Sequence, residues 1–78
     1  MILSKEHLNT IRPHISKVAV IDDLDILVQS DRPEDLYTVL DALDDLFVYY
    51  LQPDDEPSDL SLMFEKIRDQ FYYDNFIR

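Results

Sequence analysis

The chain has 78 residues and none of them is glycine. An average protein contains about 7% glycine, so about five would be expected at this length. The absence excludes a glycine-rich phosphate loop, a dinucleotide-binding fingerprint and the nucleophile elbow of serine hydrolases. It also disfavours two-residue β-hairpins, because their turns normally need glycine.

The length and the hydrophobic periodicity predict one all-α domain, residues 1–78, folded as a small bundle of three or four short helices. Ser4 is suited to cap a first helix that runs to about Arg12. Pro13 then ends that helix, because proline lacks the backbone donor that a helix interior requires.

The strongest helical pattern covers residues 32–51. Asp31, with Glu34 three residues later, resembles a capping box, and Pro33 suits the first turn. The apolar positions follow a spacing of three and four residues, as expected for an amphipathic helix. They are Leu36, Val39, Leu40, Leu43, Leu46, Phe47, Tyr50 and Leu51.

A loop at residues 53–57 separates this helix from a last one, which Ser58 can cap. The apolar face of the last helix is Leu60, Met63, Phe64, Ile67 and Phe71, with Phe76 and Ile77 as a possible extension.

Residues 17–30 fit two structures. Their apolar spacing fits a helix capped by Asp22, whereas their many β-branched side chains also fit a β-hairpin turning at Asp22-Asp23. The helix is favoured because the turn has no glycine. The β-hairpin remains the alternative.

Acidic residues outnumber basic ones by 17 to 7, which gives a formal net charge of −10. Residues 21–59 hold 13 acids and a single base, Arg32, whereas residues 1–20 carry a net charge of +2. Nucleic acids and anionic membranes are bound by basic surfaces, so we expect no direct nucleic-acid binding and no membrane binding. No secretory leader or apolar span is visible, and we expect a cytoplasmic protein.

Eight residues are candidates for a partner-binding surface. Three acids lie opposite or beside the apolar stripe of the long helix, and like charges three or four residues apart repel one another with no lysine to relieve them. Such acids either meet a basic partner or only keep the protein soluble. The eight candidates are Glu34, Asp41, Asp44, Asp45, Tyr49, Asp54, Asp55 and Glu56.

Tyr49 is the aromatic member of this set. Consecutive helix positions point about 100° apart, so Tyr50 can pack in the core while Tyr49 stays exposed beside the acidic loop. Exposed tyrosines are enriched at binding hot spots.

No metal, cofactor or catalytic site is expected. The window 54–65 begins and ends like a calcium loop, but Asp59 stands where that loop needs glycine. His7 and His14 are expected to be surface histidines. The chain has no cysteine nucleophile and little room for a catalytic cleft, so we expect no enzyme.

Tyr49-Tyr50, followed by Asp54-Asp55-Glu56-Pro57 and a helix, resembles a segment of the small helical immunity proteins that block nuclease bacteriocins. In that family the tyrosines stand on a separate short helix and the acidic turn is further away. The resemblance agrees in length, acidity and helical character, and we assign no residue role and no membership from it.

The sequence therefore predicts a small acidic inhibitor that docks on a basic, nucleic-acid-binding or nuclease protein, with carboxylates where phosphates would sit. Toxin immunity proteins, DNA mimics and phage-type inhibitors belong to this class. The alternative is a non-enzymatic structural or adaptor module that forms a homodimer or larger homo-oligomer through the apolar faces of its helices.

Overall fold

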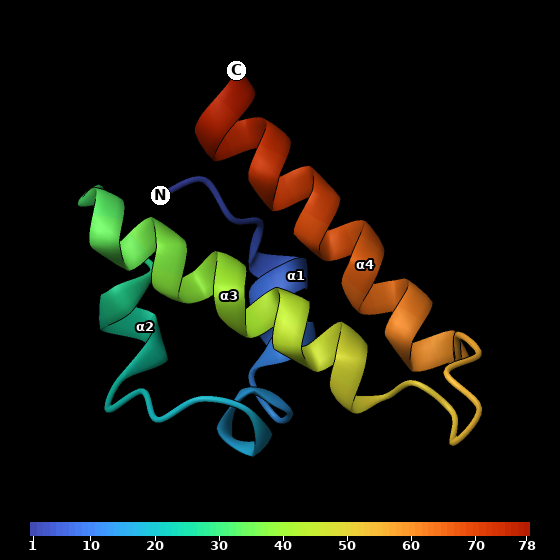
Figure 1. Ribbon diagram of the computed structural model, residues 1–78. Coiled ribbons are helices and arrows are strands. Elements are labelled where there is room, and N and C mark those ends of the chain that lie inside the picture. The colour runs from blue at the N-terminus through green and yellow to red at the C-terminus, as the bar shows by residue number, and fades with distance from the viewer.

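The computed structural model describes residues 1–78 and contains four α-helices and no β-strand, which confirms the predicted all-α fold. A 3-10 turn, η1, follows α1, and a π-helical turn, η2, continues α4. No helix has both the length and the apolar character that a membrane crossing requires. The elements are α1 (Lys5–Ile11), η1 (Ile15–Lys17), α2 (Leu24–Leu27), α3 (Pro33–Tyr49), α4 (Asp59–Tyr72) and η2 (Tyr73–Ile77), as Figure 1 shows.

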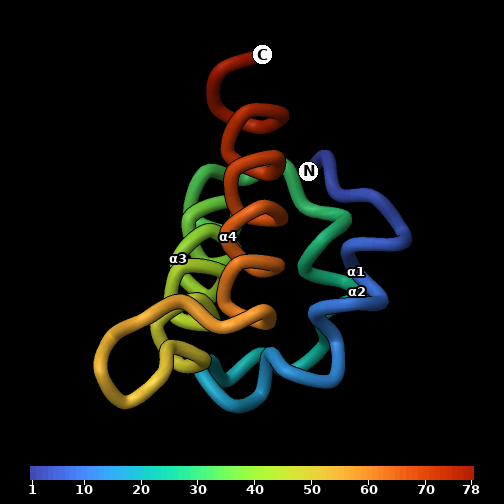
Figure 2. The backbone as a smooth tube through the Cα atoms, turned by 90° about the vertical axis from the view of Figure 1, so that its right-hand side faces the viewer, coloured from blue at the N-terminus to red at the C-terminus, as the bar shows by residue number.

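The two long helices, α3 and α4, form a hairpin that makes the most extensive contact in the molecule. The chain reverses after α3, and α4 returns beside it (Figures 1 and 2). Leu43 and Leu46 of α3 and Phe64 and Phe71 of α4 have almost no exposed surface. The predicted apolar stripes of both helices therefore meet each other in one core.

Residues 1–31 cover one side of this hairpin (Figure 2). Ile11, Ile15 and Leu24 reach into the core and complete it. The N-terminal amine donates hydrogen bonds to the carbonyl oxygen of Ser30, at 2.6 Å, and to Asp31 Oδ1, at 3.0 Å. These bonds hold the start of the chain against the segment that enters α3.

The two termini lie at the same end of the molecule (Figures 1 and 2). The side chain of Asn75 accepts a hydrogen bond from the backbone N–H of Ile2 and donates one to its carbonyl oxygen, at 2.7 and 2.8 Å. Asn75 therefore pairs with the extended N-terminal segment much as a neighbouring strand would.

Serine caps start α1 and α4, as predicted. Ser4 Oγ accepts a hydrogen bond from the backbone N–H of His7 at 3.1 Å. Ser58 and Ser61 form a reciprocal capping box, in which each hydroxyl accepts from the backbone N–H of the other residue. Ser58 Oγ also donates to the carbonyl oxygen of Tyr50 at 2.5 Å, which joins the end of α3 to the start of α4.

The capping box expected for Asp31 and Glu34 is wrong. The N-cap of α3 is Arg32, whose side chain makes no capping hydrogen bond, and Pro33 occupies the first turn as predicted. Asp31 is instead engaged by the N-terminal amine. This partner is 30 residues away in the sequence, so local spacing gave no sign of it.

The β-hairpin alternative for residues 17–30 is wrong, and the helix there is shorter than predicted. Only Leu24–Leu27 is α-helical, and its cap is Asp23 rather than Asp22. Residues 18–23 run as an irregular strap beneath the bundle (Figure 1). The β-branched residues Val18, Val20 and Ile21 disfavour a helix, and the missing glycine disfavours a tight hairpin.

The loop between α3 and α4 turns without glycine because an aspartate takes the left-handed conformation. Asp55 has φ = 62°, a region that aspartate enters more readily than most residues. The N–H of Asp55 donates to the carbonyl oxygen of Gln52 at 2.8 Å, and that of Gln52 donates to the carbonyl oxygen of Glu56 at 2.9 Å. The loop is therefore an ordered turn.

We expect Ser58→Ala to lower the free energy of unfolding by about 1–2 kcal/mol, because it removes an N-cap and the bond to Tyr50 together. Urea denaturation measures the change. Ser16→Ala is the matched control, since Ser16 is exposed and caps no helix, and it should stay within about 0.5 kcal/mol of the wild type. Equal losses in both variants would contradict the capping role.

Candidate functional site

Five of the eight predicted site residues carry a negative charge that no basic group of the chain neutralises. They lie on the second half of α3 and in the loop that follows it, and all are exposed. None forms an ion pair, although four arginines and the N-terminal amine do so elsewhere. We call this set the acidic edge: Asp41, Asp45, Asp54, Asp55 and Glu56.

Asp41 and Asp45 stand on the side of α3 that faces away from the core. They are one helical turn apart, about 6 Å along the axis, and so are direct neighbours. Leu43 lies between them in sequence and is fully buried on the opposite side. The burial of the apolar stripe thus fixes where these two carboxylates point.

Asp44 is not free: no lysine relieves it, as the sequence indicated, but an arginine of the other long helix does. Arg68 of α4 donates from Nε to Asp44 Oδ1 at 2.8 Å. Burial acts to lower the pKa of Arg68, but the hydrogen bonds and charges of Asp44 and Asp69 outweigh it and raise that pKa above its usual value. This pair lies beside Phe47 in a groove of about 200 Å³ between α3 and α4.

Glu34 lies apart from the rest of the predicted site. It is in the first turn of α3 and forms an ion pair with Arg32. It lies seven positions before Asp41, about 10 Å along the helix, and the acidic loop lies beyond the opposite end of α3. Glu34 therefore does not join the acidic edge.

Tyr49 and Tyr50 divide as predicted at the end of α3. Tyr49 is about half exposed, at 52%, and its ring meets the ring of Tyr50 edge to face, with centroids 4.9 Å apart. Tyr50 is half-buried and stacks near Phe64. Tyr49 is thus an exposed aromatic at the same end of the bundle as the acidic loop.

His14 is not the surface histidine that the sequence suggested. It is half-buried, its Nδ1 lies 2.7 Å from Tyr50 Oη in a hydrogen bond, and its ring packs edge to face on Phe64. His14 therefore joins the segment after α1 to the core of the α3–α4 hairpin, and it supports the position of Tyr50.

Several acids elsewhere in the chain have local partners. Arg12 hydrogen-bonds Asp25 at 2.5 Å, which joins α1 to α2 and holds the pKa of Asp25 below its usual value. Arg78 pairs with Asp74 at 3.4 Å. No three histidine, aspartate or glutamate side chains converge in an arrangement that would hold a metal ion.

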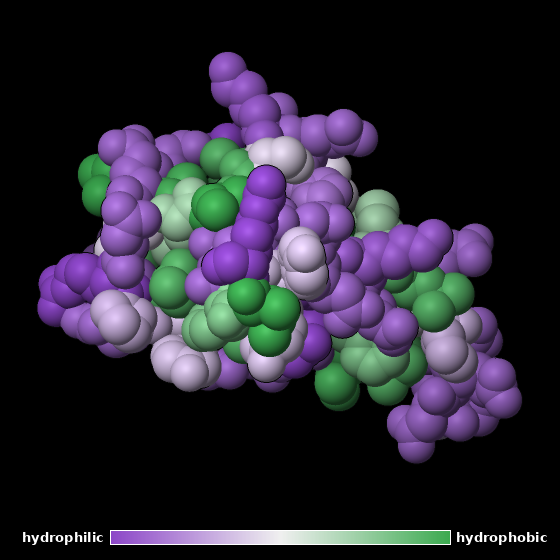
Figure 3. All heavy atoms as spheres, turned by 90° about the horizontal axis from the view of Figure 1, so that it is seen from above, coloured by the Kyte–Doolittle hydropathy of each residue, from purple (hydrophilic) through white to green (hydrophobic).

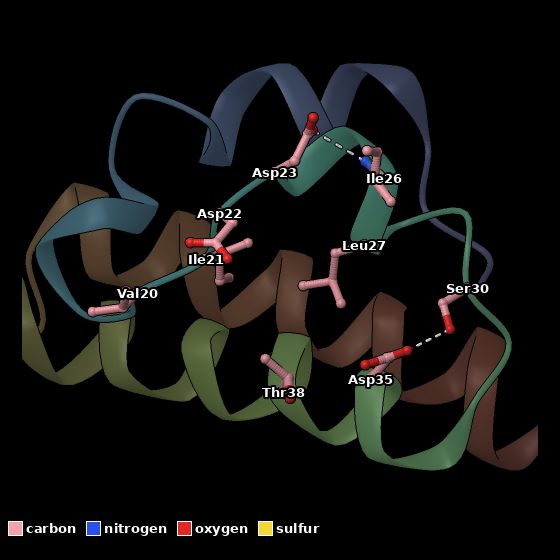
Figure 4. Close-up of a pocket in the computed structure, with 9 residues that line it drawn as sticks. All are labelled: Val20, Ile21, Asp22, Asp23, Ile26, Leu27, Ser30, Asp35 and Thr38. Carbon is pink, nitrogen blue, oxygen red and sulfur yellow. Dashed lines mark hydrogen bonds between the residues drawn. The ribbon is translucent and has the colours of Figure 1, made fainter.

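Sequence reasoning missed a pocket of about 450 Å³ between the strap that leads into α2 and the first half of α3. Val20, Ile21, Ile26 and Leu27 supply apolar surface, and Leu27 points from α2 toward α3 (Figure 4). Asp35 and Thr38 line the pocket from the α3 side. The only sign of this pocket in the sequence was that two apolar residues stand directly before two aspartates at positions 20–23.

Exposed apolar side chains also occur where α4 ends against the start of α3. The ring of Tyr37 lies 5.1 Å from that of Phe76, and Tyr72 stacks on Phe76 at 5.4 Å. Tyr37, Tyr72 and Tyr73 are exposed, as is Ile77. In the view from above, apolar atoms form several separate groups between polar ones rather than one continuous patch (Figure 3).

The chain matches no protein-family model, no curated protein and no solved structure. The chemistry of its surfaces is the remaining guide to its function. Exposed carboxylates without partners attract cations, and an exposed tyrosine beside them adds apolar contact area. The acidic edge and Tyr49 together are suited to contact a basic protein surface.

Three substitutions on α3 should change the stability of the protein in different directions, depending on whether the acid has an ion-pair partner. We expect Asp41→Asn and Asp45→Asn each to raise the free energy of unfolding by a few tenths of a kcal/mol, because each removes like-charge repulsion. Asp44→Asn makes the same charge change, but it should lower the free energy of unfolding by about 0.5 kcal/mol because it breaks the ion pair with Arg68. The loss is small because solvent screens this partly exposed pair.

Urea denaturation at low ionic strength measures the three variants under one condition. Added salt should shrink all three differences, because it screens exposed charges. A stabilising Asp44→Asn substitution would contradict the structural role of the Arg68 pair.

Proposed function

We propose that this protein is a small acidic inhibitor that binds the basic surface of a nucleic-acid-binding protein or nuclease. The observation that carries the proposal is the acidic edge, whose five exposed carboxylates have no ion-pair partner within the chain. A partner that supplies cations would relieve the repulsion between them. Its own basic groups would gain counter-charges at the same time.

The way in which the acids are held supports binding over mere solubility. Asp41 and Asp45 project from a helix whose other side is locked in the core, and the loop acids sit in a hydrogen-bonded turn. Aspartate has a short side chain, so little rotamer entropy is lost when a partner orders its carboxylate. Charges already held in place cost less to bind than mobile ones.

The chemistry of the acidic edge selects the class of partner. Proteins that bind nucleic acids present arginine and lysine where phosphates lie, and a row of carboxylates can occupy those positions. Opposite charges steer the two proteins together rapidly at low salt, and the association weakens as salt rises. Immunity proteins and phage-type inhibitors are examples of this mode of action.

The test is capture of partners from a cell lysate on the immobilised protein, at about 50 mM and at about 300 mM salt. We expect a basic, nucleic-acid-handling protein that is retained at the lower salt and lost at the higher one. The variant Asp41→Asn/Asp45→Asn/Asp55→Asn should lose it as well. Asparagine tolerates the left-handed conformation at position 55, so the loop should keep its shape.

A triple variant away from the acidic edge controls for net charge. Glu6→Gln/Glu65→Gln/Asp69→Asn removes the same three charges and should retain the partner. Equal loss in both triple variants would show that total charge matters rather than the acidic edge. Recovery of a partner that is insensitive to salt and to both variants would overturn the proposal.

A second candidate function is a structural or adaptor module that associates with itself. The exposed aromatic residues near Phe76 favour it, because Tyr37 of α3 and Tyr72 of α4 present their rings together there. Tyrosine offers a large contact area at low entropic cost. In this case the acids would only maintain solubility.

Sedimentation over a wide range of protein concentrations tests this candidate. Self-association should appear as a rising average mass, and Tyr37→Ser/Ile77→Ser should abolish it while Asp41→Asn/Asp45→Asn leaves it unchanged or strengthens it. Both Tyr37 and Ile77 are exposed, so the core should not be disturbed. A constant monomer mass at every concentration would reject self-association.

A further inference from the structure

The pocket beside α2 combines apolar surface with acidic groups. Val20 is 100% exposed and Ile26 is 67% exposed, so two branched aliphatic side chains stand in solvent at its border. Its volume of about 450 Å³ falls within the range of small binding pockets. Ile21 and Leu27 lie between these two exposed side chains, and a ligand seated there would cover this apolar surface.

The charge of the pocket is entirely negative. Asp22, Asp23 and Asp35 line it, and no lysine, arginine or histidine does so. Asp23 already caps Ile26, whereas Asp22 takes part in no ion pair. Asp35 is half-buried and accepts a hydrogen bond from Ser30 Oγ at 2.5 Å, which leaves its other carboxylate oxygen without a hydrogen-bond partner in the chain.

Apolar surface next to carboxylates favours one kind of occupant, a long aliphatic stem that ends in a cation. Asp22 lies on the strap and Asp35 on α3, on opposite sides of the pocket (Figure 4). A planar guanidinium has five N–H donors and can serve two carboxylates at once. It also loses its hydration more easily than an ammonium group does.

The pocket adjoins the proposed partner surface. Thr38 lines it, and Asp41 of the acidic edge is three residues further along α3, so the two are neighbours on the helix surface. A basic protein that covers the acidic edge would therefore reach the mouth of the pocket with its own side chains.

We propose that this pocket receives an arginine side chain of the basic partner. The aliphatic stem lies against Ile21 and Leu27, which stand between the two carboxylates, and the guanidinium lies between Asp22 and Asp35. The inference rests on the proposed function for the identity of the partner, but the pocket itself can be tested without any partner.

The test is a titration of the 15N-labelled full chain with N-acetyl-arginine amide, followed by the amide chemical shifts. We expect saturable shifts at Ile21, Ile26, Leu27 and Thr38. The neutral isostere N-acetyl-citrulline amide should bind at least tenfold more weakly, and N-acetyl-lysine amide at least threefold. Shifts elsewhere only, or equal binding of the citrulline or lysine probe, would overturn the assignment.

Two variants test the acidic part and the apolar part of the site separately. Asp22→Asn and Ile21→Thr should each weaken arginine binding at least fivefold. Asp22 is exposed, and threonine keeps the β-branched shape of the half-buried Ile21, so the fold should persist. Glu65→Gln removes one exposed charge on α4, outside both the pocket and the acidic edge, and should leave binding unchanged. An equal effect of Glu65→Gln would show unspecific attraction and contradict the pocket.

The two proposals fail in different ways. If the acidic edge binds a partner through other contacts, salt-sensitive capture persists while the arginine titration shows no pocket shifts. If the pocket binds arginine but the acidic edge has no partner, the titration succeeds and capture fails.

Discussion

The apolar contact between α3 and α4 is the constraint on which the rest of the molecule depends. A chain of this size buries a modest share of its surface, and most of its core is a single layer between the two helices. Leu43 and Leu46 on one side and Phe64 and Phe71 on the other have almost no contact with water. This contact fixes the rotation of α3 about its own axis. It therefore decides that Asp41 and Asp45 face outward and that Asp44 faces Arg68.

The distribution of charge follows from that arrangement. Arginines are used to join elements: Arg12 links α1 to α2, and Arg68 links α4 to α3. Five acids without ion-pair partners gather on the acidic edge, where repulsion opposes folding by a small amount per pair. A basic partner would convert this cost into binding free energy, since the carboxylates are already held in place. Asp22 and Asp35, beside the apolar surface of the pocket, would likewise gain a counter-charge from a basic side chain.

Local patterns in the sequence were sufficient to predict the two long helices, the caps at Ser4 and Ser58, and the division between Tyr49 and Tyr50. Each depends on residues within a turn or two of one another. Features set by distant contacts were not predictable in this way. Arg68 is 24 residues from Asp44, and the amine that engages Asp31 is 30 residues away. The strap before α2 has no regular period, because its conformation is set by what it packs against, and so the pocket above it left no periodic signal.

In the proposed function, the acidic edge occupies the place of nucleic acid on its partner. The most direct measurement is a competition between this protein and a fluorescent DNA duplex for the captured basic protein, followed by fluorescence anisotropy. We expect the protein to displace the duplex completely and competitively, whereas the variant Asp41→Asn/Asp45→Asn/Asp55→Asn should not displace it. A ternary complex, in which the partner holds the duplex and this protein at once, would contradict it.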